Sequence, residues 1–356
     1  MAASLKNRLL CLGLRVPDKL KEGRKWGAGP AGGRYVLVHD TIANVPIFGF
    51  AEHSPIHLFE DQGRCHVTDG VKRSEVRLFE TPRFYSSVTS DGIPMGKIAL
   101  AHGNRCLGST VYQKCIRWRR EEQCHFCGIE LSLKHGTTVL MKKPLQLAEV
   151  AETAEAEGFE HVTLTTGTPN LRDKGAGILS KAARAVKERT NMRIHVQIEP
   201  PHKNEIETLH SSGADSIGIH IESLDRAVLE RVCPGKASGY DDYFGAWQDA
   251  LGVFGGNQVS SYVILGLGED RDATLAGVER MCQIGVIPFV VPLRPLEGTA
   301  LQDRSPPPPE IMEEFYIHAC RMMEEYGIDP TRNLAGCVRC GGCSALTDYY
   351  RGYHDR

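Results

Sequence analysis

Three cysteines in the first half of the chain have a type and spacing that suit metal chemistry. They lie in the stretch Cys115-Ile-Arg-Trp-Arg-Arg-Glu-Glu-Gln-Cys124-His-Phe-Cys127. Three thiolates can hold a 4Fe–4S cluster by three of its irons and leave the fourth iron open to a small molecule. A structural zinc site is the alternative, but such sites need four ligands, and no second pair of cysteines lies nearby. We therefore expect an iron–sulfur cluster on Cys115, Cys124 and Cys127.

A second group of cysteines lies close to the C-terminus, in Cys337-Val-Arg-Cys340-Gly-Gly-Cys343. This spacing matches the first three cysteines of a ferredoxin-type run, although the fourth local ligand is absent. We expect a second iron–sulfur cluster here, with a zinc site completed from elsewhere as the alternative. The other six of the 12 cysteines are scattered along the chain.

The composition is that of a globular protein. The chain has 356 residues, of which 41% are hydrophobic and 24% are charged, enough for one large α/β domain with attachments or for two ordinary domains. The formal net charge of −2 gives no indication of binding to nucleic acid or to an acidic membrane. No apolar run reaches the ~18 residues that span a bilayer, and no leader cleavage site follows the N-terminal apolar patch. We expect a cytoplasmic protein.

From residue 97 onward, short apolar runs alternate with amphipathic segments. We expect strands at Lys97–Ala101, His161–Thr165, Arg193–Ile198, Ser216–Glu222, Val259–Leu265 and Pro288–Leu293. We expect helices at Leu145–Glu157, Ala176–Arg189, Asn204–Ser211, Tyr240–Phe254 and Asp272–Ile284. This alternation predicts an α/β fold with a parallel sheet. Six units are too few for a closed eight-stranded barrel, so we expect a partial (βα)6 barrel of the TIM type, with an open doubly wound sheet as the alternative.

The chain divides into three expected parts. Residues 1–95 contain short β-type runs and form a small N-terminal accessory region. Residues 96–304 form the barrel. Residues 305–356 contain a proline-rich linker, a helix at Glu310–Tyr326 and the cysteine-rich tail. The residues from Tyr326 to Cys337 can span about 36 Å when extended, enough to bring the tail to the mouth of the barrel.

The ending Cys124-His-Phe-Cys127 resembles the cysteine signature of the radical S-adenosylmethionine (SAM) superfamily. In that signature three residues usually separate the first two cysteines, whereas eight residues separate Cys115 from Cys124. The departure leaves open whether Cys115 or Cys106 is the first ligand, and we favour Cys115 because it is nearer.

Other stretches resemble the SAM-binding motifs of the superfamily and occur in its order. Thr165-Thr166-Gly167-Thr168 stands where the superfamily places the edge that binds the SAM amino group. Ile219-His220-Ile221-Glu222-Ser223 is similar to the strand that binds the SAM ribose in biotin and lipoyl synthases, and Val263 to Glu269 resembles the adenine-binding segment. The resemblance thus implies a set of cofactor-binding residues: Thr165, Thr166, Gly167, His220, Glu222, Gly266 and Glu269.

Two basic residues are further candidates. Lys236 is a weaker candidate for the SAM carboxylate. Arg294 follows the last expected strand and would hold a substrate carboxylate at the barrel mouth, or else form a structural ion pair.

The barrel resembles the biotin and lipoyl synthase branch, and the whole chain resembles a radical SAM family encoded beside nitrilase genes. The resemblance implies reductive cleavage of SAM on a 4Fe–4S cluster, with electrons from a donor such as ferredoxin or flavodoxin. It also implies hydrogen abstraction from a small-molecule substrate. The tail cluster would then donate sulfur, or it would conduct electrons during an oxidation or rearrangement. A non-catalytic iron–sulfur or zinc-binding scaffold is the alternative from another class.

Overall fold

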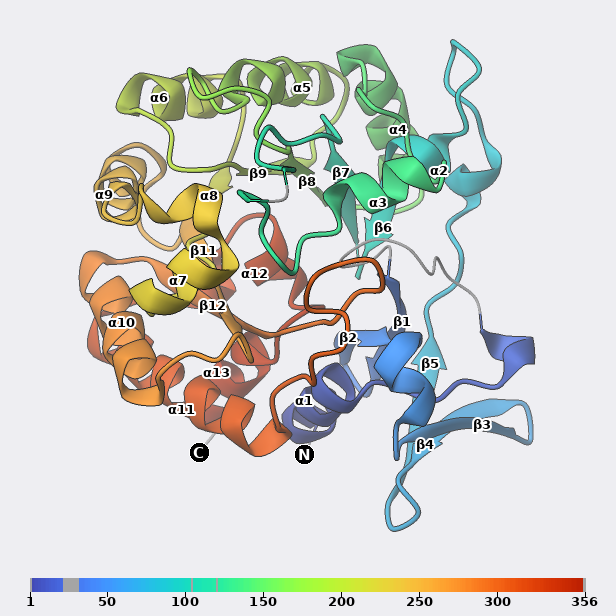
Figure 1. Ribbon diagram of the computed structural model, residues 1–356. Helices are drawn as coiled ribbons and strands as arrows, with labels where there is room; N and C mark the ends of the chain where they lie inside the picture. The colour runs from blue at the N-terminus through green and yellow to red at the C-terminus, as the bar shows by residue number, and fades with distance from the viewer. Residues whose placement is uncertain (1, 22–31, 104, 120, 355–356) are drawn as a thin grey trace.

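The larger sheet is a partial barrel, as the sequence predicts. The computed structural model describes residues 2–21, 32–103, 105–119 and 121–354 (Figure 1). In this part of the chain a seven-stranded sheet has the order β12-β11-β10-β9-β8-β7-β6, with β7 to β12 parallel and β6 antiparallel to β7. The strands are β6 (Leu100–His102), β7 (Cys106–Thr110), β8 (His161–Thr165), β9 (Arg193–Gln197), β10 (Ser216–Gly218), β11 (Val259–Leu265) and β12 (Ile287–Pro292).

The first barrel strand differs from the prediction. We expected it at Lys97–Ala101, but α2 (Met95–Ile98) and the short β6 occupy that region, and the first parallel strand is β7. The chain reverses between β6 and β7 at Gly103, which has a φ of +55°. The β7 sequence Cys-Leu-Gly-Ser-Thr has few strong strand formers. Its strand conformation comes from pairing with β8 in the core of the fold, where Cys106 lies opposite His161.

Helices cover the outer face of the barrel (Figure 1). The five predicted helices are present, with ends within two residues of the predicted ranges, because their apolar residues recur with helical spacing, while three short helices of this layer were not predicted. Trp247 is completely buried under this layer and donates its Nε1–H to the carbonyl of Ile219 at 2.9 Å. The helices after α2 are α3 (Ile129–Lys134), α4 (Pro144–Ala156), α5 (Ala176–Arg189), α6 (Lys203–Ser211), α7 (Arg226–Val232), α8 (Pro234–Ala237), α9 (Asp242–Phe254) and α10 (Arg271–Ile284). None of the helices in the described ranges is long and apolar enough to cross a membrane.

The N-terminal region forms an antiparallel sheet with its own apolar core. The strand order is β2-β1-β5-β4-β3, and α1 (Ala2–Leu12) contacts β2. The core contains Leu9, Val36, Val45 and Leu58. The remaining elements of this region are η1 (Asp18–Leu20), β1 (Gly33–Val38), β2 (Thr41–Pro46), η3 (Gly49–His53), β3 (His57–Asp61), β4 (Arg64–Thr68), β5 (Arg73–Leu78) and η4 (Arg83–Ser86).

The C-terminal segment closes the amino-terminal end of the barrel. It contains α11 (Pro309–Glu325), η5 (Pro330–Arg332), α12 (Cys337–Cys340) and α13 (Leu346–His354). The backbone N–H of Gly336 donates to Nδ1 of His161 at 3.1 Å, and the Ser216 hydroxyl donates to the carbonyl of Ala335 at 3.0 Å. His161 and Ser216 are the first residues of β8 and β10, so the tail lies under the barrel and not at its mouth, where we expected it.

The N-terminal sheet holds the tail from the other side. The backbone N–H of Asn44 donates to the carbonyl of Gly342 at 2.7 Å. The ammonium of Lys6, which is 1% exposed, pairs with the carboxylate of Asp348 at 2.5 Å. A buried ion pair that loses one partner leaves an uncompensated charge. The hydrogen bond and the ion pair therefore hold the N-terminal region and the C-terminal tail together.

Docking of the tail depends on Gly336. Its φ is +89°, and a Cβ at this position would lie 2.2 Å from Cγ of His195. We predict that Gly336→Ala destabilises the protein by about 1–3 kcal/mol in urea unfolding, the usual cost of overpacking. Gly245→Ala is the control, because nothing lies within 4 Å of a Cβ there. Its effect should be a gain of about 0.5–1 kcal/mol. Equal unfolding midpoints for the two variants would contradict the packing described for the tail.

Candidate active site

The first cysteine group lies at the carboxyl end of the barrel strands. Cys115, Cys124 and Cys127 all line one cavity of about 200 Å³. The loop that carries them is held by backbone hydrogen bonds to two barrel segments. The N–H of Ile116 donates to the carbonyl of Thr168 at 2.9 Å, and the N–H of His125 donates to the carbonyl of Val232 at 2.8 Å. In barrels of this kind, the carboxyl end carries the active site.

Cys106 is not in this group. It is the first residue of β7, is completely buried, and contacts Thr163 at 3.6 Å between Sγ and Oγ1. It does not line the cavity that holds Cys115. Of the two candidates for the first ligand, the structure therefore places Cys115 beside Cys124 and Cys127.

The three cysteines of the group are half-buried and lie near charged groups. The hydrogen bond from the Cys233 thiol lowers the pKa of Cys124, with a smaller contribution from Lys236. Burial, together with the neighbouring Cys124, raises the pKa of Cys127 to about 12. Such a thiol stays protonated unless a bound cation stabilises the thiolate, and a coordinating metal removes the proton outright. A cysteine-bound iron–sulfur cluster fits this chemistry.

Lys236 and Glu222 form an ion pair beside the cysteines. The Lys236 ammonium lies 3.1 Å from Oε1 of Glu222, and both side chains are largely buried. Burial raises the pKa of Glu222, and the attraction of Lys236 opposes that effect. Glu222 also has a φ of +69°, which is rare for a residue with a side chain and concentrates at functional sites.

Sequence reasoning missed a second carboxylate in the cavity, Glu199. Its carboxylate accepts hydrogen bonds from Nε of Arg117 at 2.9 Å and from the hydroxyl of Thr168 at 2.7 Å. Arg117 lies between Cys115 and Cys124 in the sequence, so this ion pair fixes the cysteine loop to the end of β9. Glu199 could have been identified from the sequence, because it lies just after a barrel strand.

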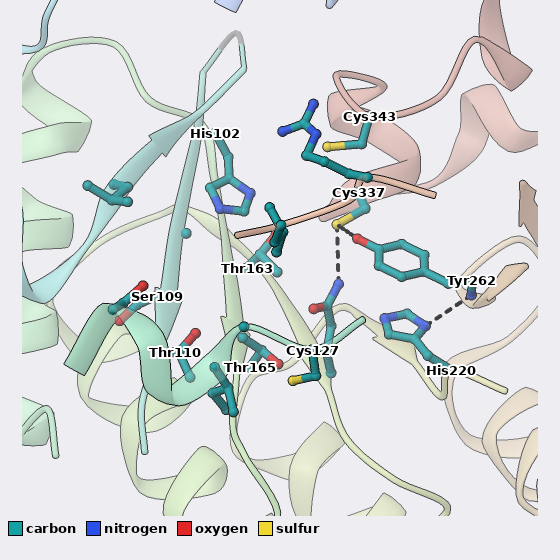
Figure 2. Close-up of a pocket in the computed structure, with 18 of the residues that line it drawn as sticks. His102, Ser109, Thr110, Cys127, Thr163, Thr165, His220, Tyr262, Cys337 and Cys343 are labelled. Carbon is teal, nitrogen blue, oxygen red and sulfur yellow. Dashed lines mark hydrogen bonds between the residues drawn. The ribbon is translucent and has the colours of Figure 1, made fainter. Parts of the chain in front are cut away.

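A larger cavity of about 430 Å³ occupies the barrel lumen (Figure 2). Thr163 and Tyr262 line it from β8 and β11, His220 lines it from the segment after β10, and Cys127 lies in its wall. The two cavities share lining residues, which are Phe126, Cys127, Ile129, Thr165, Gln197, His220 and Glu222. The volume is within the range of about 300–1,000 Å³ that small-molecule sites have.

The second cysteine group reaches this lumen from the opposite end. Figure 2 shows Cys337 and Cys343 on the other side of the cavity from Cys127. The sulfur of Cys337 accepts hydrogen bonds from the Tyr262 hydroxyl at 2.8 Å and from Nε2 of Gln197 at 3.2 Å. Burial raises the pKa of Cys337 to about 12. The hydrogen bonds from Tyr262 and Gln197 oppose that effect on the pKa and favour the thiolate form that a metal binds.

Neither cysteine group is arranged as the ligand shell of a single ion. Among the described residues, no three His, Cys, Asp or Glu side chains are placed to hold one metal ion. In an iron–sulfur cluster each cysteine binds a different iron, so the sulfurs lie farther apart than the ligands of one ion.

The expected SAM-binding residues divide into two sets. Thr165, Thr166, Gly167, His220 and Glu222 line the cavity of the first cysteine group. Gly266 and Glu269 line neither this cavity nor the lumen. They form a turn after β11, in which the N–H of Gly266 donates to the carboxylate of Glu269 at 2.7 Å.

Arg294 lies inside the protein and not at the barrel mouth, where we expected it. Its guanidinium donates to the carbonyl of Asn44, and the side chain lines the lumen. Burial lowers its pKa, while the nearby Cys343 and Tyr35 oppose that effect. The cationic group is thus next to the second cysteine group.

Comparisons with known proteins found one matching family model and similar solved structures. The family model of the radical SAM superfamily matches residues 121–281. Among solved structures, methylornithine synthase is 19% identical, with 62% of each chain covered and a TM-score of 0.48. The FeFe-hydrogenase maturase HydG from Carboxydothermus hydrogenoformans is 18% identical, with 62% of this chain and 51% of that chain covered and a TM-score of 0.49. A radical SAM methyltransferase from Sphaerobacter thermophilus is 14% identical, with 80% of this chain and 76% of that chain covered and a TM-score of 0.45.

The chain therefore spans 62% and 51% of the lengths of the first two structures. No curated protein sequence matches it. The matched residues include Cys124, Cys127 and strands β8 to β11. Residues 121–281 thus form a radical SAM superfamily domain.

Proposed function

We propose that the protein is a radical SAM enzyme that cleaves SAM at Cys115, Cys124 and Cys127 and abstracts hydrogen from a small molecule in the barrel lumen. One observation carries the proposal: the cavity of the three cysteines shares a wall with the lumen. A 4Fe–4S cluster on these cysteines would supply the electron that splits SAM into methionine and a 5′-deoxyadenosyl radical. The electron would come from a donor such as ferredoxin or flavodoxin.

The residues around the cavity have separate roles in binding SAM. Glu222 is a carboxylate acceptor for the two ribose hydroxyls. Lys236 keeps Glu222 in place and offers a cation to the SAM carboxylate. Thr165, Thr166 and Gly167 line the cavity from the end of β8 and are the proposed contact of the SAM amino group. His220, stacked on Tyr262 with ring centroids 4.0 Å apart, separates the SAM side from the deeper lumen.

The lumen is the substrate chamber of the proposal. Its lining is mainly apolar but contains a few polar groups, the usual combination in sites for small molecules. Arg294 is the candidate for a substrate carboxylate. The tail closes the amino-terminal end below the chamber, which limits the access of water to a reactive radical.

The tail cysteines are the site of a second cluster in this proposal. Cys337 and Cys343 line the chamber, so such a cluster would be next to the substrate. It would either give up sulfur to the substrate or carry an electron away from it. Within the superfamily, we place the protein in the biotin and lipoyl synthase branch, near the family encoded beside nitrilase genes. This placement rests on the SAM-binding motifs and on the tail.

The first test is SAM cleavage by the anaerobically reconstituted protein. With dithionite as reductant, wild type should form 5′-deoxyadenosine, and Cys115→Ala, Cys124→Ala and Cys127→Ala should form none. Cys282→Ala is the matched control, since this buried thiol lies in α10 next to Cys320 and away from both groups. Undiminished product from Cys127→Ala would refute the assignment of the cleavage site.

The second test concerns Glu222. Its replacement in Glu222→Gln should weaken SAM binding by about 1.5–3 kcal/mol, the usual loss for hydrogen bonds to a charged group. Iron content should not change, because the carboxylate contacts the ligand and not the metal. The control is Glu279→Gln, whose carboxylate bonds Gln283 and Tyr326 outside the barrel. Isothermal titration that gives the same affinity for both variants would show that Glu222 serves only to hold the strand.

A further inference from the structure

The tail has three cysteines, whereas a fully cysteine-ligated 4Fe–4S cluster needs four. The structure brings a fourth thiol to the tail from a distant part of the sequence. Cys106 begins β7 and lies opposite His161, the first residue of β8. Nδ1 of the same His161 accepts the N–H of Gly336, which directly precedes Cys337. One histidine thus places Cys106 and the start of the tail cysteine run at the same end of the barrel.

Cys340 lies against the hairpin that carries Cys106. Its Sγ is 3.6 Å from the carbonyl of His102, and His102 is the cross-strand partner of Cys106. A Cβ at Gly103, in the turn of this hairpin, would lie 2.6 Å from the Cys340 sulfur. The β6–β7 hairpin therefore lies against Cys340 through His102 and Gly103, and it places Cys106 at the same end of the barrel as the tail thiols.

Tyr35 of the N-terminal sheet marks where these thiols converge. Its ring is buried and lies within electrostatic range of the sulfurs of Cys343, Cys340 and Cys106. In the described part of the chain the Tyr35 hydroxyl has no hydrogen-bond partner. A buried hydroxyl that lacks a partner is costly, and the sulfur of a bound cluster would accept its hydrogen bond.

We propose that Cys106 is the fourth ligand, with Cys337, Cys340 and Cys343, of a 4Fe–4S cluster at the amino-terminal end of the barrel. The inference rests on the second cluster of the proposed function and assigns a ligand to it. With four thiolates every iron is bound by the protein, so this cluster has no open position for SAM. The two clusters thereby differ in ligand number, and SAM binds at one of them.

The surroundings of the four thiols suit a buried anionic cluster. Arg294 lies next to Cys343, and Lys6 is within electrostatic range of Cys340 and Cys343. Lys6 is buried and Arg294 is half-buried, and positive charge shielded from water in this way stabilises a thiolate-bound cluster that is itself anionic. Cys337 and Cys343 line the lumen, whereas Cys340 lines a separate hollow with Arg105 and Arg339. One edge of the cluster therefore faces the substrate chamber, and the opposite edge faces away from it.

The experiment compares iron and sulfide content and spectra of full-length protein reconstituted anaerobically. The variants are Cys106→Ala, the nearly isosteric Cys106→Ser, the triple variant in which Cys337, Cys340 and Cys343 are alanine, and the control Cys282→Ala. The triple variant should lose about half of the wild-type iron. Cys106→Ala should lose the same half, or retain it as a three-iron cluster with the corresponding electron paramagnetic resonance (EPR) signal. In Cys106→Ser the cluster should persist with a shifted spectrum or be lost.

Formation of 5′-deoxyadenosine from SAM reports on folding and on the other cluster, and it should continue in all of these variants. If Cys106→Ala and Cys106→Ser have the same iron content and the same spectra as Cys282→Ala, the assignment of Cys106 as a cluster ligand is overturned. If the iron content of the triple variant equals that of wild type, or if the tail binds zinc in place of iron, the proposal of a second iron–sulfur cluster is overturned as well. In either case 5′-deoxyadenosine formation would still support SAM cleavage, so the two proposals fail separately.

Discussion

A thiolate is costly to bury unless a cation accompanies it, and this cost governs both ends of the barrel. Burial raises the pKa of Cys127 at the carboxyl end and of Cys337 at the amino-terminal end to about 12 in each case. Burial thus opposes the thiolate form of both residues. A half-buried basic residue lies near each group, Lys236 at one end and Arg294 at the other. Each group of cysteines therefore has a cation beside it, and both groups face one lumen.

The remaining architecture keeps that lumen enclosed. Six parallel strands form only part of a barrel, so the sheet leaves an amino-terminal end and a seam to be covered. The tail covers the end through its bonds to His161 and Ser216. The N-terminal sheet in turn holds the tail through Asn44 and Lys6. Residues that seemed accessory in the sequence are therefore part of the wall around the second cysteine group.

Sequence alone predicted the elements whose pattern is local. The longer helices of the barrel, α4, α5, α6, α9 and α10, were predicted to within two residues because their apolar residues repeat with the helical period, whereas the shorter α3, α7 and α8 were not predicted. The first barrel strand was predicted wrongly, because β7 is a strand through its pairing with β8 and not through its own residues. The grouping of Cys115 with Cys124 and Cys127 followed from their proximity in the sequence. The approach of Cys340 to the hairpin that carries Cys106 could not be predicted, because it arises from docking of the tail onto a segment that is distant in the sequence. Glu199 could have been identified from its position just after a barrel strand, but its pairing with Arg117 on a different loop could not.

The central claim is that one barrel holds two iron–sulfur clusters at opposite ends of a substrate chamber, and that SAM binds to one of them. EPR spectroscopy of the reduced wild-type protein, recorded with and without SAM, tests it most directly. The account predicts two reduced cluster signals of similar intensity, of which SAM shifts one and leaves the other unchanged. A single signal, or two signals that both ignore SAM, would contradict it.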